Sequence, residues 1–397
     1  MFQKLILFCI VILLASCKPN IDIEKTNSTS QVESFIQQDA EWTNAFLRDE
    51  NVFGVDGIFS IPLNGKEFSK PSAKDSILFV FSDSLIKLKG KIKDNKLGND
   101  EYKMIHNSLG IATGEDLINS LKFDYKSENG MPKTVFEPND ENKEHYYWLG
   151  DGFVNTAGDS ALYIFAYKII DVETEGFFSF EQLSVDILKI DKHERYPFSN
   201  YEIIKTDLMF PVAGYMGQAT FGNAILVNTN EAGAPHPDGY IYIYGTIGFE
   251  KDLFAARVLP NDFDKMSAWK YWDGKSWVSE KENVKKLVSN TSNEMSVSPL
   301  QNGQFVLVYQ HAGMEPSVVM QLSKSPVGPF YPPKTIYHCP EVLEDKDFFA
   351  YNAKGHPSIS SPDSLLISYN VNSFDFFVDV LTKPNLYRPR FIKISLD

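Results

Sequence analysis

Five short apolar segments recur along the chain, and each ends on an aromatic residue. A turn rich in Gly, Asp, Asn or Ser comes directly before every one of them. Such segments after tight turns are typical of β-strands. The segments are Ile77–Phe81, Ala161–Phe165, Tyr240–Tyr244, Phe305–Tyr309 and Leu365–Tyr369.

Each of these segments has a shorter strand-like stretch before it, so the chain repeats a two-strand unit. The earlier stretches are Gly57–Leu63, Gly152–Asn155, Gln218–Ile225, Met295–Ser298 and Pro357–Ser360. Further strands are expected at Phe254–Leu259, Val318–Ser323 and Phe391–Leu396, and a hairpin at Trp269–Trp277 turns at Asp273-Gly274. A repeat of roughly 60–80 residues indicates units that stack on their neighbours.

The pattern predicts an all-β protein, a five-bladed β-propeller. A large β-sandwich or jelly roll is the alternative, but its strands recur every roughly 8–12 residues without such grouping. Helical periodicity is scarce, and Gly114–Leu121 is the one short helix we expect. No boundary inside the repeating region is visible.

The first 16 residues have the pattern of a secretory signal peptide. Lys4 is followed by the apolar run Leu5–Ala15, and small residues precede Cys17. This arrangement resembles a bacterial lipoprotein signal, which predicts cleavage of residues 1–16 and acylation of Cys17. A permanent span is the alternative, although a spanning helix needs about 20 apolar residues. We therefore predict a flexible polar tether at 17–38 and the propeller at 39–397.

The net charge and the cysteine content narrow the classes of partner and the kind of stabilisation that we expect. The chain has a net charge of −14, which argues against binding to nucleic acid or to anionic lipid surfaces. It has three cysteines, and removal of Cys9 with the signal and acylation of Cys17 would leave Cys339 alone. No intramolecular disulfide is then expected, so a sizeable core must hold the fold together.

Candidate chemistry lies where the innermost strands of the blades begin, because these positions converge at one mouth of a propeller. Asp56, Asp151, Glu294 and His356 precede the first, second, fourth and fifth inner strands. The third opens on Tyr215–Gln218 and has no acid, and Asp83 ends a strand that returns to the same mouth.

Carboxyl groups at close range raise one another's pKa, which separates an acid from a base. Hydrolysis of a glycosidic bond needs such a pair. We expect Asp56 to be the general base or nucleophile, Glu294 or Asp151 the acid, and Asp83 to tune their charge. The alternative is structural, because an Asp before a Gly at a strand start commonly forms a turn.

Several polar and aromatic residues are candidates for binding sugar hydroxyls or rings: Asn107, Trp148, Arg257, His356 and Arg390. Each has a structural alternative in a blade wall, a strand cap or a tie between the last strand and the first blade. Phosphate-binding glycine loops, a zinc-binding His pair and a Cys-x-x-Cys pair are absent from the sequence. We expect no cofactor and no metal; a central calcium ion is the alternative, although no sequence motif signals it.

The order of several motifs resembles domain-of-unknown-function family 4185 and its relatives over Trp42 to Leu396. They are Trp42, Gly54–Gly57, Ser60–Leu63, Phe79–Asp83, Tyr242–Thr246, Ala256–Val258, Trp272–Trp277, Ser323–Phe330, His356-Pro357, Ser368–Asn372 and Tyr387–Phe391. The resemblance implies a five-bladed propeller similar to glycoside hydrolases, some of them endo-acting D-arabinanases. It implies a base at Asp56 and a supporting carboxylate at Asp151. The acid of the third blade is missing, and Glu294 on the fourth is the nearest candidate.

Together these features predict a lipid-anchored, extracytoplasmic glycoside hydrolase that acts on a polysaccharide, with an arabinofuranose-containing polymer as one candidate. The bacterial outer membrane, on its periplasmic or cell-surface side, is the expected location. A non-catalytic glycan-binding or scaffold propeller is the alternative. A third alternative, a propeller that docks a protein partner, predicts an exposed apolar patch in place of a polar cup.

Overall fold

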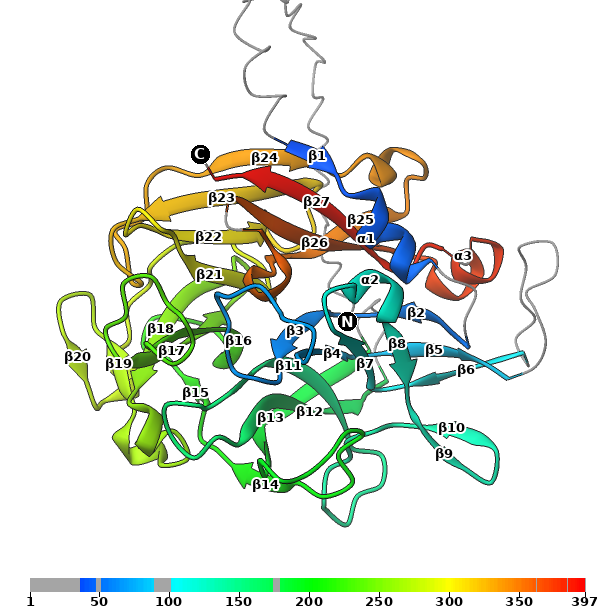
Figure 1. The fold of residues 1–397 in the computed structure, drawn as a ribbon, viewed down its shortest axis with the longest axis horizontal. Coiled ribbons are helices and arrows are strands. Elements are labelled where there is room, and N and C mark those ends of the chain that lie inside the picture. Colours follow the sequence, from blue (N-terminus) through cyan, green and yellow to red (C-terminus); the bar gives the residue numbers. More distant parts are fainter. Residues whose placement is uncertain are drawn as a thin grey trace, which may run out of the picture. The chain divides into compact units, whose positions relative to one another are not determined.

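The computed structural model describes residues 36–47, 51–88, 101–173, 179–361, 363–383 and 385–396. Within these ranges the strands form seven antiparallel sheets, five of which contain four or six strands and surround a central axis (Figure 1). We call these five sheets blades 1 to 5, in chain order. The predicted all-β propeller is confirmed.

The strands of each blade pair with one another in the following order. Blade 1 contains β3 (Phe59–Pro62), β4 (Ser76–Phe81), β7 (Ser108–Thr113) and β8 (Lys122–Asp124). Blade 2 contains β11 (Tyr146–Val154), β12 (Leu162–Asp171), β13 (Phe180–Ile190) and β14 (Glu202–Lys205). Blade 3 contains β15 (Met209–Pro211), β16 (Gln218–Asn228), β17 (Tyr240–Ile247), β18 (Asp252–Val258), β19 (Lys270–Trp272) and β20 (Trp277–Val278). Blade 4 contains β21 (Met295–Pro299), β22 (Phe305–Gln310), β23 (Ser317–Ser323) and β24 (Lys334–His338). Blade 5 contains β25 (Phe348–Gly355), β26 (Ser364–Ser373), β27 (Pro389–Ser395) and β1 (Ile36–Gln38).

Smaller elements complete the described chain. A three-stranded sheet of β2 (Val52–Val55), β5 (Ser84–Lys87) and β6 (Tyr102–Ile105) extends blade 1, and β9 (Lys126–Glu128) pairs with β10 (Met131–Lys133). The α-helices are α1 (Ala40–Phe46), α2 (Leu117–Ser120) and α3 (Phe376–Thr382). The 3₁₀ helices span Pro260–Asp262, Met266–Ala268, Lys281–Asn283, Pro340–Leu343 and Pro357–Ile359. None of the helices in the described ranges has the length and apolarity to cross a bilayer.

The five apolar segments seen in the sequence are β4, β12, β17, β22 and β26, which pair with the axis-lining strands β3, β11, β16, β21 and β25. These strands are buried on both faces because each pairs with a strand on either side and packs between neighbouring blades. This burial explains their apolar runs, which are the strongest strand signal in the sequence. The predicted hairpin at Asp273-Gly274 and the short helix near Leu117 are also present.

The inner strands contact each other in sequence around the axis, from β3 through β11, β16 and β21 to β25. The ring closes within blade 5, whose outermost strand β1 pairs with β27, with Ile36 opposite Ile394. The last three residues of the predicted tether therefore belong to the fold. Because β25, β26, β27 and β1 alternate in direction, Ile36 lies at the end of blade 5 where the inner strand finishes.

The inner strand of blade 5 corrects the sequence prediction. Pro357–Ile359 forms a 3₁₀ helix, and the inner strand is the preceding β25. A proline has no N–H for a ladder hydrogen bond, so Pro357 is a poor residue for a paired strand. The segment β25 was missed because its apolar pattern is interrupted by Asn352, which has φ 60°, and by Lys354.

Interruptions at one level are a shared feature of the inner strands. β11 has a register shift between Leu149 and Gly152, and β16 between Phe221 and Ala224. β25 has one between Tyr351 and Lys354, and in blade 1 the path breaks between β2 and β3. A bulge locally re-aims side chains. The interruptions turn side chains of four blades toward the axis at the same height.

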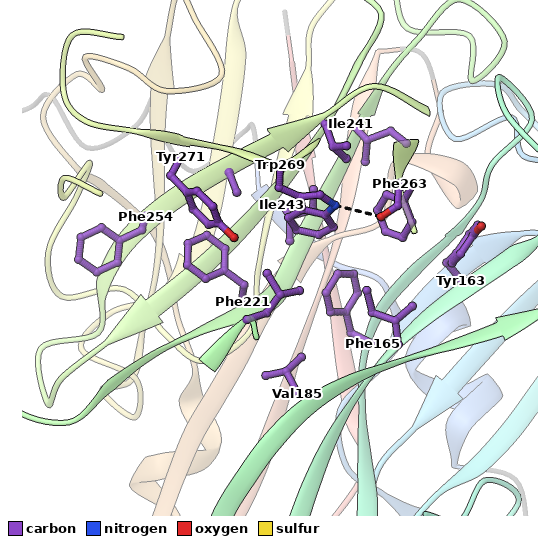
Figure 2. Packing of buried hydrophobic residues seen from close by; sticks show 14 of the residues in the cluster. Tyr163, Phe165, Val185, Phe221, Ile241, Ile243, Phe254, Phe263, Trp269 and Tyr271 are labelled. Carbon is purple, nitrogen blue, oxygen red and sulfur yellow. Dashed lines mark hydrogen bonds between the residues drawn. The ribbon is translucent and has the colours of Figure 1, made fainter. Parts of the chain in front are cut away.

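Aromatic packing between blades holds this ring together. The largest cluster lies between blades 2 and 3, where Tyr163 and Phe165 meet Phe221 and Phe263 (Figure 2). Trp269 is 1% exposed, and its indole N–H donates to the carbonyl of Phe263 at 2.9 Å. These apolar walls support a polar axis.

Candidate functional site: an acidic cup at the propeller axis

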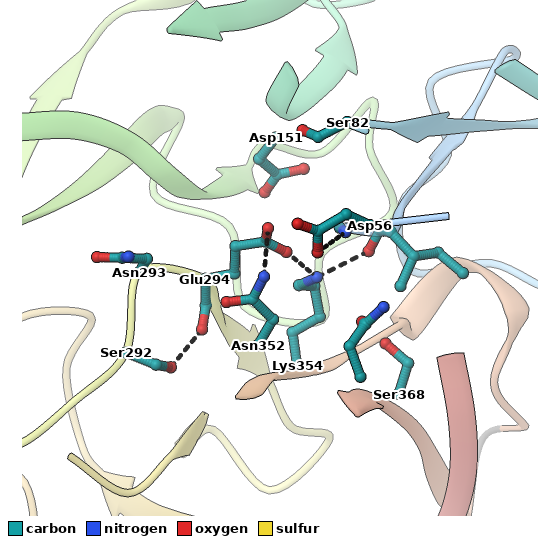
Figure 3. A network of polar contacts seen from close by, with 12 residues as sticks. Asp56, Ser82, Asp151, Ser292, Asn293, Glu294, Asn352, Lys354 and Ser368 are labelled. Carbon is teal, nitrogen blue, oxygen red and sulfur yellow. Dashed lines mark hydrogen bonds and ion pairs between the residues drawn. The ribbon is translucent and has the colours of Figure 1, made fainter. Parts of the chain in front are cut away.

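Three of the predicted acids converge at the axis. Asp56 comes from the break between β2 and β3, Asp151 from the bulge of β11, and Glu294 from the residue before β21 (Figure 3). A Cβ placed on Gly57 would lie 3.1 Å from Oε1 of Glu294, which shows how closely blades 1 and 4 approach. We call Asp56, Asp83, Asp151, Glu294 and Lys354 the cup.

Hydrogen bonds at the level of the cup link every blade to the next. Ser82 Oγ is 3.1 Å from the N–H of Leu149, which joins blades 1 and 2. The remaining links are Ile225 N–H to Asp151 Oδ2 (2.7 Å), Asn223 Nδ2 to the Asn293 carbonyl, Asn352 Nδ2 to Glu294 Oε1 (2.8 Å), and Lys354 Nζ to the Ile58 carbonyl (3.0 Å). Asp151 and Glu294 therefore have a structural role in this circle.

The carboxyl of Asp56 is not part of this circle of hydrogen bonds, and its neighbours are of another kind. Its Oδ1 accepts the N–H of the next residue, Gly57, at 2.7 Å, so the turn expected of an Asp-Gly pair is present. The side chains of Tyr351 and Tyr387 interact with the carboxyl group. Burial, together with the charges of Glu294 and Asp83, raises the pKa of Asp56 to about 7.

Asp151 is held by the backbone on both oxygens. Oδ1 accepts the N–H of Gly152 at 2.8 Å, and Oδ2 accepts that of Ile225 at 2.7 Å. Burial raises the pKa of Asp151 to about 7, although the two N–H groups oppose the rise. An oxygen that faces an N–H must accept, so this geometry suits the carboxylate form.

Glu294 forms an ion pair that the sequence did not indicate. Its Oε2 accepts from Nζ of Lys354, while Oε1 accepts from the Asn352 amide. Burial raises the pKa of Glu294, and the neighbouring ammonium opposes the rise. Both partners are donors, so this geometry also suits the carboxylate.

Asp83 lies at the edge of the cup and pairs with a histidine. His106 Nδ1 is 3.1 Å from Asp83 Oδ1, and the imidazole stacks on Tyr146 with ring centroids 3.6 Å apart. The side chain of His106 is 32% exposed, which places this pair at the solvent boundary between blades 1 and 2.

Two predicted sugar-binding residues have structural roles, which corrects their assignment. Asn107 is fully buried; its amide donates to the carbonyls of Phe136 and Tyr147 and accepts from two backbone N–H groups. The guanidinium of Arg390 donates to three backbone carbonyls of residues 385–388 and pairs with Glu341. These groups organise loops, so their donors are already used.

Arg257 lies two strands out from the axis, on β18, away from the cup. Its guanidinium lies between the rings of Tyr240 and Trp277, 3.9 and 4.4 Å from their centroids. This stacking joins blade 3 to its own outer hairpin. The structure does not bring Arg257 together with the acids.

His356 and Trp148 are near cup residues in the sequence, two residues after Lys354 and three before Asp151. His356 is 1% exposed and bridges Ser60 and Ser368 through its two ring nitrogens, and burial lowers its pKa well below the usual range. It is a neutral residue of the channel wall. Trp148 is half-buried three residues before Asp151 and packs on Phe180 at 4.5 Å. Its proposed stacking on a sugar stays a prediction.

A polar cavity continues from the cup along the axis. Its wall includes Ser60, Glu67, Asp151, Ser296, Lys354 and His356. Burial and the charge of Asp151 raise the pKa of Glu67 well above its usual range. No group of three or more His, Cys, Asp or Glu side chains within the described ranges is arranged to hold a metal ion.

Sequence reasoning missed four residues that contact the acids: Lys354, Asn352, Tyr351 and Tyr387. Three belong to β25, whose strand pattern is broken by these same residues. A lysine and an asparagine inside an otherwise apolar segment were the available signal. The predicted signal peptide, residues 1–16, and the predicted acylation site, Cys17, lie outside the described residues.

Comparison with solved structures shows which proteins have a similar fold. A structure from Bacteroides ovatus described as a "putative hydrolase" superposes with a TM-score of 0.67 at 20% identity, covering 91% of this chain and 90% of that one. An inulosucrase from Halalkalicoccus jeotgali bound to kestose gives 0.50 at 12% identity, covering 91% and 88%. An α-L-arabinofuranosidase from Podospora anserina, in complex with cellotriose, gives 0.44 at 9%, covering 87% and 98%.

The superpositions on the Bacteroides ovatus and Halalkalicoccus jeotgali structures show a shared fold. No curated protein matches the chain in sequence. The resemblance to family 4185 stays a prediction, because the family model that matches is a different one. It covers residues 39–396, nearly the whole described fold. The chain therefore belongs to the family described as Domain of unknown function (DUF5005).

Proposed function

We propose that this protein is a glycoside hydrolase whose active site is the cup. The observation that carries the proposal is the convergence of three carboxyl groups from blades 1, 2 and 4 at one recessed point on the axis. Cleavage of a glycosidic bond requires one carboxyl that donates a proton and one that accepts it. The propeller neighbours include proteins named for carbohydrate chemistry, which supports a glycan as substrate.

The hydrogen bonds favour an assignment that differs from the one suggested by sequence position. Glu294 and Asp151 face donors on both oxygens, so they suit the ionised form. For Asp56, one backbone N–H, that of Gly57, faces Oδ1, and the neighbouring side chains of Tyr351 and Tyr387 carry hydroxyls that can either donate or accept, so its carboxyl can carry a proton. We therefore assign Asp56 as the acid and Glu294 as the base.

The reaction then balances as follows. Asp56 gives its proton to the glycosidic oxygen as the bond from the anomeric carbon to that oxygen breaks. A water molecule supplies hydroxide to the anomeric carbon, and its remaining proton passes to Glu294. Return of that proton to Asp56 through solvent restores the starting state.

The acidic cup favours a neutral sugar at the point of cleavage. Four carboxyl groups surround the axis, and among the described cup residues Lys354 is already paired with Glu294. A uronic acid would bring another negative charge into this group at a cost. An arabinofuranose-containing polymer fits this requirement and is our first candidate.

A panel of purified polysaccharides tests the proposal. We expect the protein to release oligosaccharides from at least one neutral arabinan or related polymer. Asp56→Asn and Glu294→Gln should each lower the rate by about 10²–10⁴-fold, the usual contribution of acid–base catalysis. Full activity in both variants would remove the mechanism.

One observation favours a second candidate, a glycan-binding propeller without turnover. Asp151 and Glu294 both serve the interblade circle of hydrogen bonds, as purely structural acids would. Calorimetry with the same panel separates the candidates. Binding to a polymer that is never cleaved, even at high protein concentration, supports the second.

We also propose lipid attachment at Cys17, outside the described residues, because Lys4, Leu5–Ala15 and the small residues before Cys17 form a lipoprotein-like signal. Two or more acyl chains give stable anchoring. The described fold begins at Ile36, where β1 pairs with β27 of blade 5. Incorporation of labelled fatty acid, abolished by Cys17→Ser, is the expected result.

A further inference from the structure

Lys354 is the most deeply buried charged group of the cup. Its side chain is 2% exposed, and its Nζ contacts Glu294 Oε2 and, at 3.0 Å, the carbonyl of Ile58. The ammonium also lies over the ring of Phe59, 4.3 Å from the centroid. An ammonium so far from water needs such compensation, because desolvation of a charge is costly.

The bulge of β25 places this lysine. The register shift between Tyr351 and Lys354 turns Asn352 and Lys354 toward the same acid, so blade 5 supplies both donors to Glu294. A neutral residue would satisfy the strand equally well. The protein instead keeps a charge that touches one catalytic candidate and acts on Asp151 through space.

Other titratable groups also act on this ion pair. Asp56 from blade 1, Asp151 and Tyr167 from blade 2, and Tyr351 from blade 5 interact with Glu294, and His356 of blade 5 interacts with Lys354. Asp83, Tyr387 and Glu67 act one step away, on Asp56 or Asp151. Four of these eight groups are carboxyls. Lys354 therefore supplies the positive charge that keeps Glu294 ionised among these neighbouring acids.

We propose that Lys354 is a positioning residue for hydrolysis: its ammonium keeps Glu294 ionised and oriented, which makes Glu294 the proton acceptor and leaves the proton on Asp56. This inference rests on the proposed function and specifies how its acid and base are distinguished. Lys354 itself exchanges no proton with the substrate. The bonds made and broken are those of the reaction given above.

The pH dependence of kcat/KM tests this role. Lys354→Met removes the charge with a similar chain length, so protonation of Glu294 should occur at higher pH. We expect the acidic limb of the profile to move up by about 1–3 pH units, the usual effect of losing a close opposite charge. Lys354→Arg keeps the charge, so its limb should stay near that of the wild type even if kcat falls. A uniform loss in Lys354→Met with both limbs unchanged would overturn the proposal.

A second measurement does not depend on turnover. Difference infrared spectra of protein with ¹³C-labelled glutamate report the protonation of carboxyl groups, and Glu294→Gln identifies the band of Glu294. In Lys354→Met this band should titrate at higher pH than in the wild type. An unchanged titration contradicts the inference. If the titration shifts but no glycan is cleaved by the wild type, the hydrolase function fails while the electrostatic role stands.

A matched ion pair away from the axis controls for general effects. Lys205 Nζ lies 2.7 Å from Asp186, a carboxylate that is 1% exposed in blade 2. Lys205→Met also breaks a contact to a buried acid. It should leave both the pH profile and the Glu294 band unchanged.

Discussion

Asp56 and Asp151 begin from the same local structure and end in different environments. Each precedes a glycine and accepts its N–H on Oδ1, at 2.7 and 2.8 Å. The second oxygen of Asp151 accepts a backbone N–H from blade 3, whereas Asp56 faces the side chains of Tyr351 and Tyr387. The same turn thus supports a backbone cross-link at Asp151 and, at Asp56, a carboxyl with side-chain neighbours to which we have assigned the role of acid.

The largest expected difference between the two acids is in activity without loss of fold. Asp56→Asn should lower kcat by about 10²–10⁴-fold. Its amide oxygen can still accept from Gly57, and its NH₂ can donate to the tyrosine hydroxyls, so the thermal midpoint should hold. Steady-state rates and thermal unfolding on the same preparation check this. Unfolding of Asp56→Asn would show that Asp56 is structural like Asp151.

Asp151→Asn should lose stability. The amide can satisfy Gly152, but its NH₂ would then face the N–H of Ile225, and two donors cannot pair. Leaving a buried N–H without an acceptor costs about 1–3 kcal/mol in the free energy of unfolding. Urea unfolding measures this. Asp159→Asn, a change to a partly exposed acid in the same blade, is the control.

The pH dependence of stability gives a third contrast. Burial raises the pKa of Asp56 from 3.8 to about 7, so between pH 4 and 7 the folded state holds a proton that the unfolded state has released. Stability therefore falls as the pH rises through this window. Asp56→Asn removes this contribution, and its stability relative to wild type should increase from pH 5 to pH 8. Asp75→Asn should show no such trend over that range, because hydrogen bonds from Ser72 lower the pKa of Asp75.

Removing the hydroxyl of Tyr351 beside Asp56 should have a smaller effect, seen in the pH dependence of kcat/KM. The Tyr351 side chain lowers the pKa of Asp56, so Tyr351→Phe should raise it. Since Asp56 must be protonated to act as the acid, the alkaline limb of kcat/KM should move to higher pH. Tyr215→Phe removes a hydroxyl that donates to Asp252 in blade 3, and it should leave the limb in place. Equal profiles for all three proteins would contradict the assignment of Asp56.

Arg257 should have the smallest effect on catalysis. It stacks between Tyr240 and Trp277 outside the cup, so Arg257→Gln should change kcat/KM less than twofold while lowering the thermal midpoint. A large rise in KM with unchanged stability would restore its predicted role in binding sugar.

The sequence predicted the parts of the molecule that follow local rules. The strand after the axis-lining strand of every blade is a continuous apolar run between turns, so β4, β12, β17, β22 and β26 were recognisable. The acids Asp56 and Asp151 were found through their shared place in the repeat. β25 was not recognisable, because Asn352 and Lys354 break its pattern. Residues that break local rules are expected at functional sites.

The proposed exchange of roles between Asp56 and Glu294 could not be predicted for a related reason. Sequence position shows that two acids share a level, but the neighbours that set their charge come from blade 5, far along the chain. Lys354 reaches Glu294 only after the ring has closed. The same long-range pairing explains why Asn107 and Arg390, both plausible sugar ligands in the sequence, are occupied by backbone groups in the fold.

The pairing of β1 with β27 has a consequence for biosynthesis. It joins an early folded segment of the chain to a much later one, because Ile36 pairs with Ile394. The fifth sheet therefore cannot be completed until β27 has been made. A product that terminates before β27 would present the open edges of β1 and β26, which quality-control proteases recognise as unfinished.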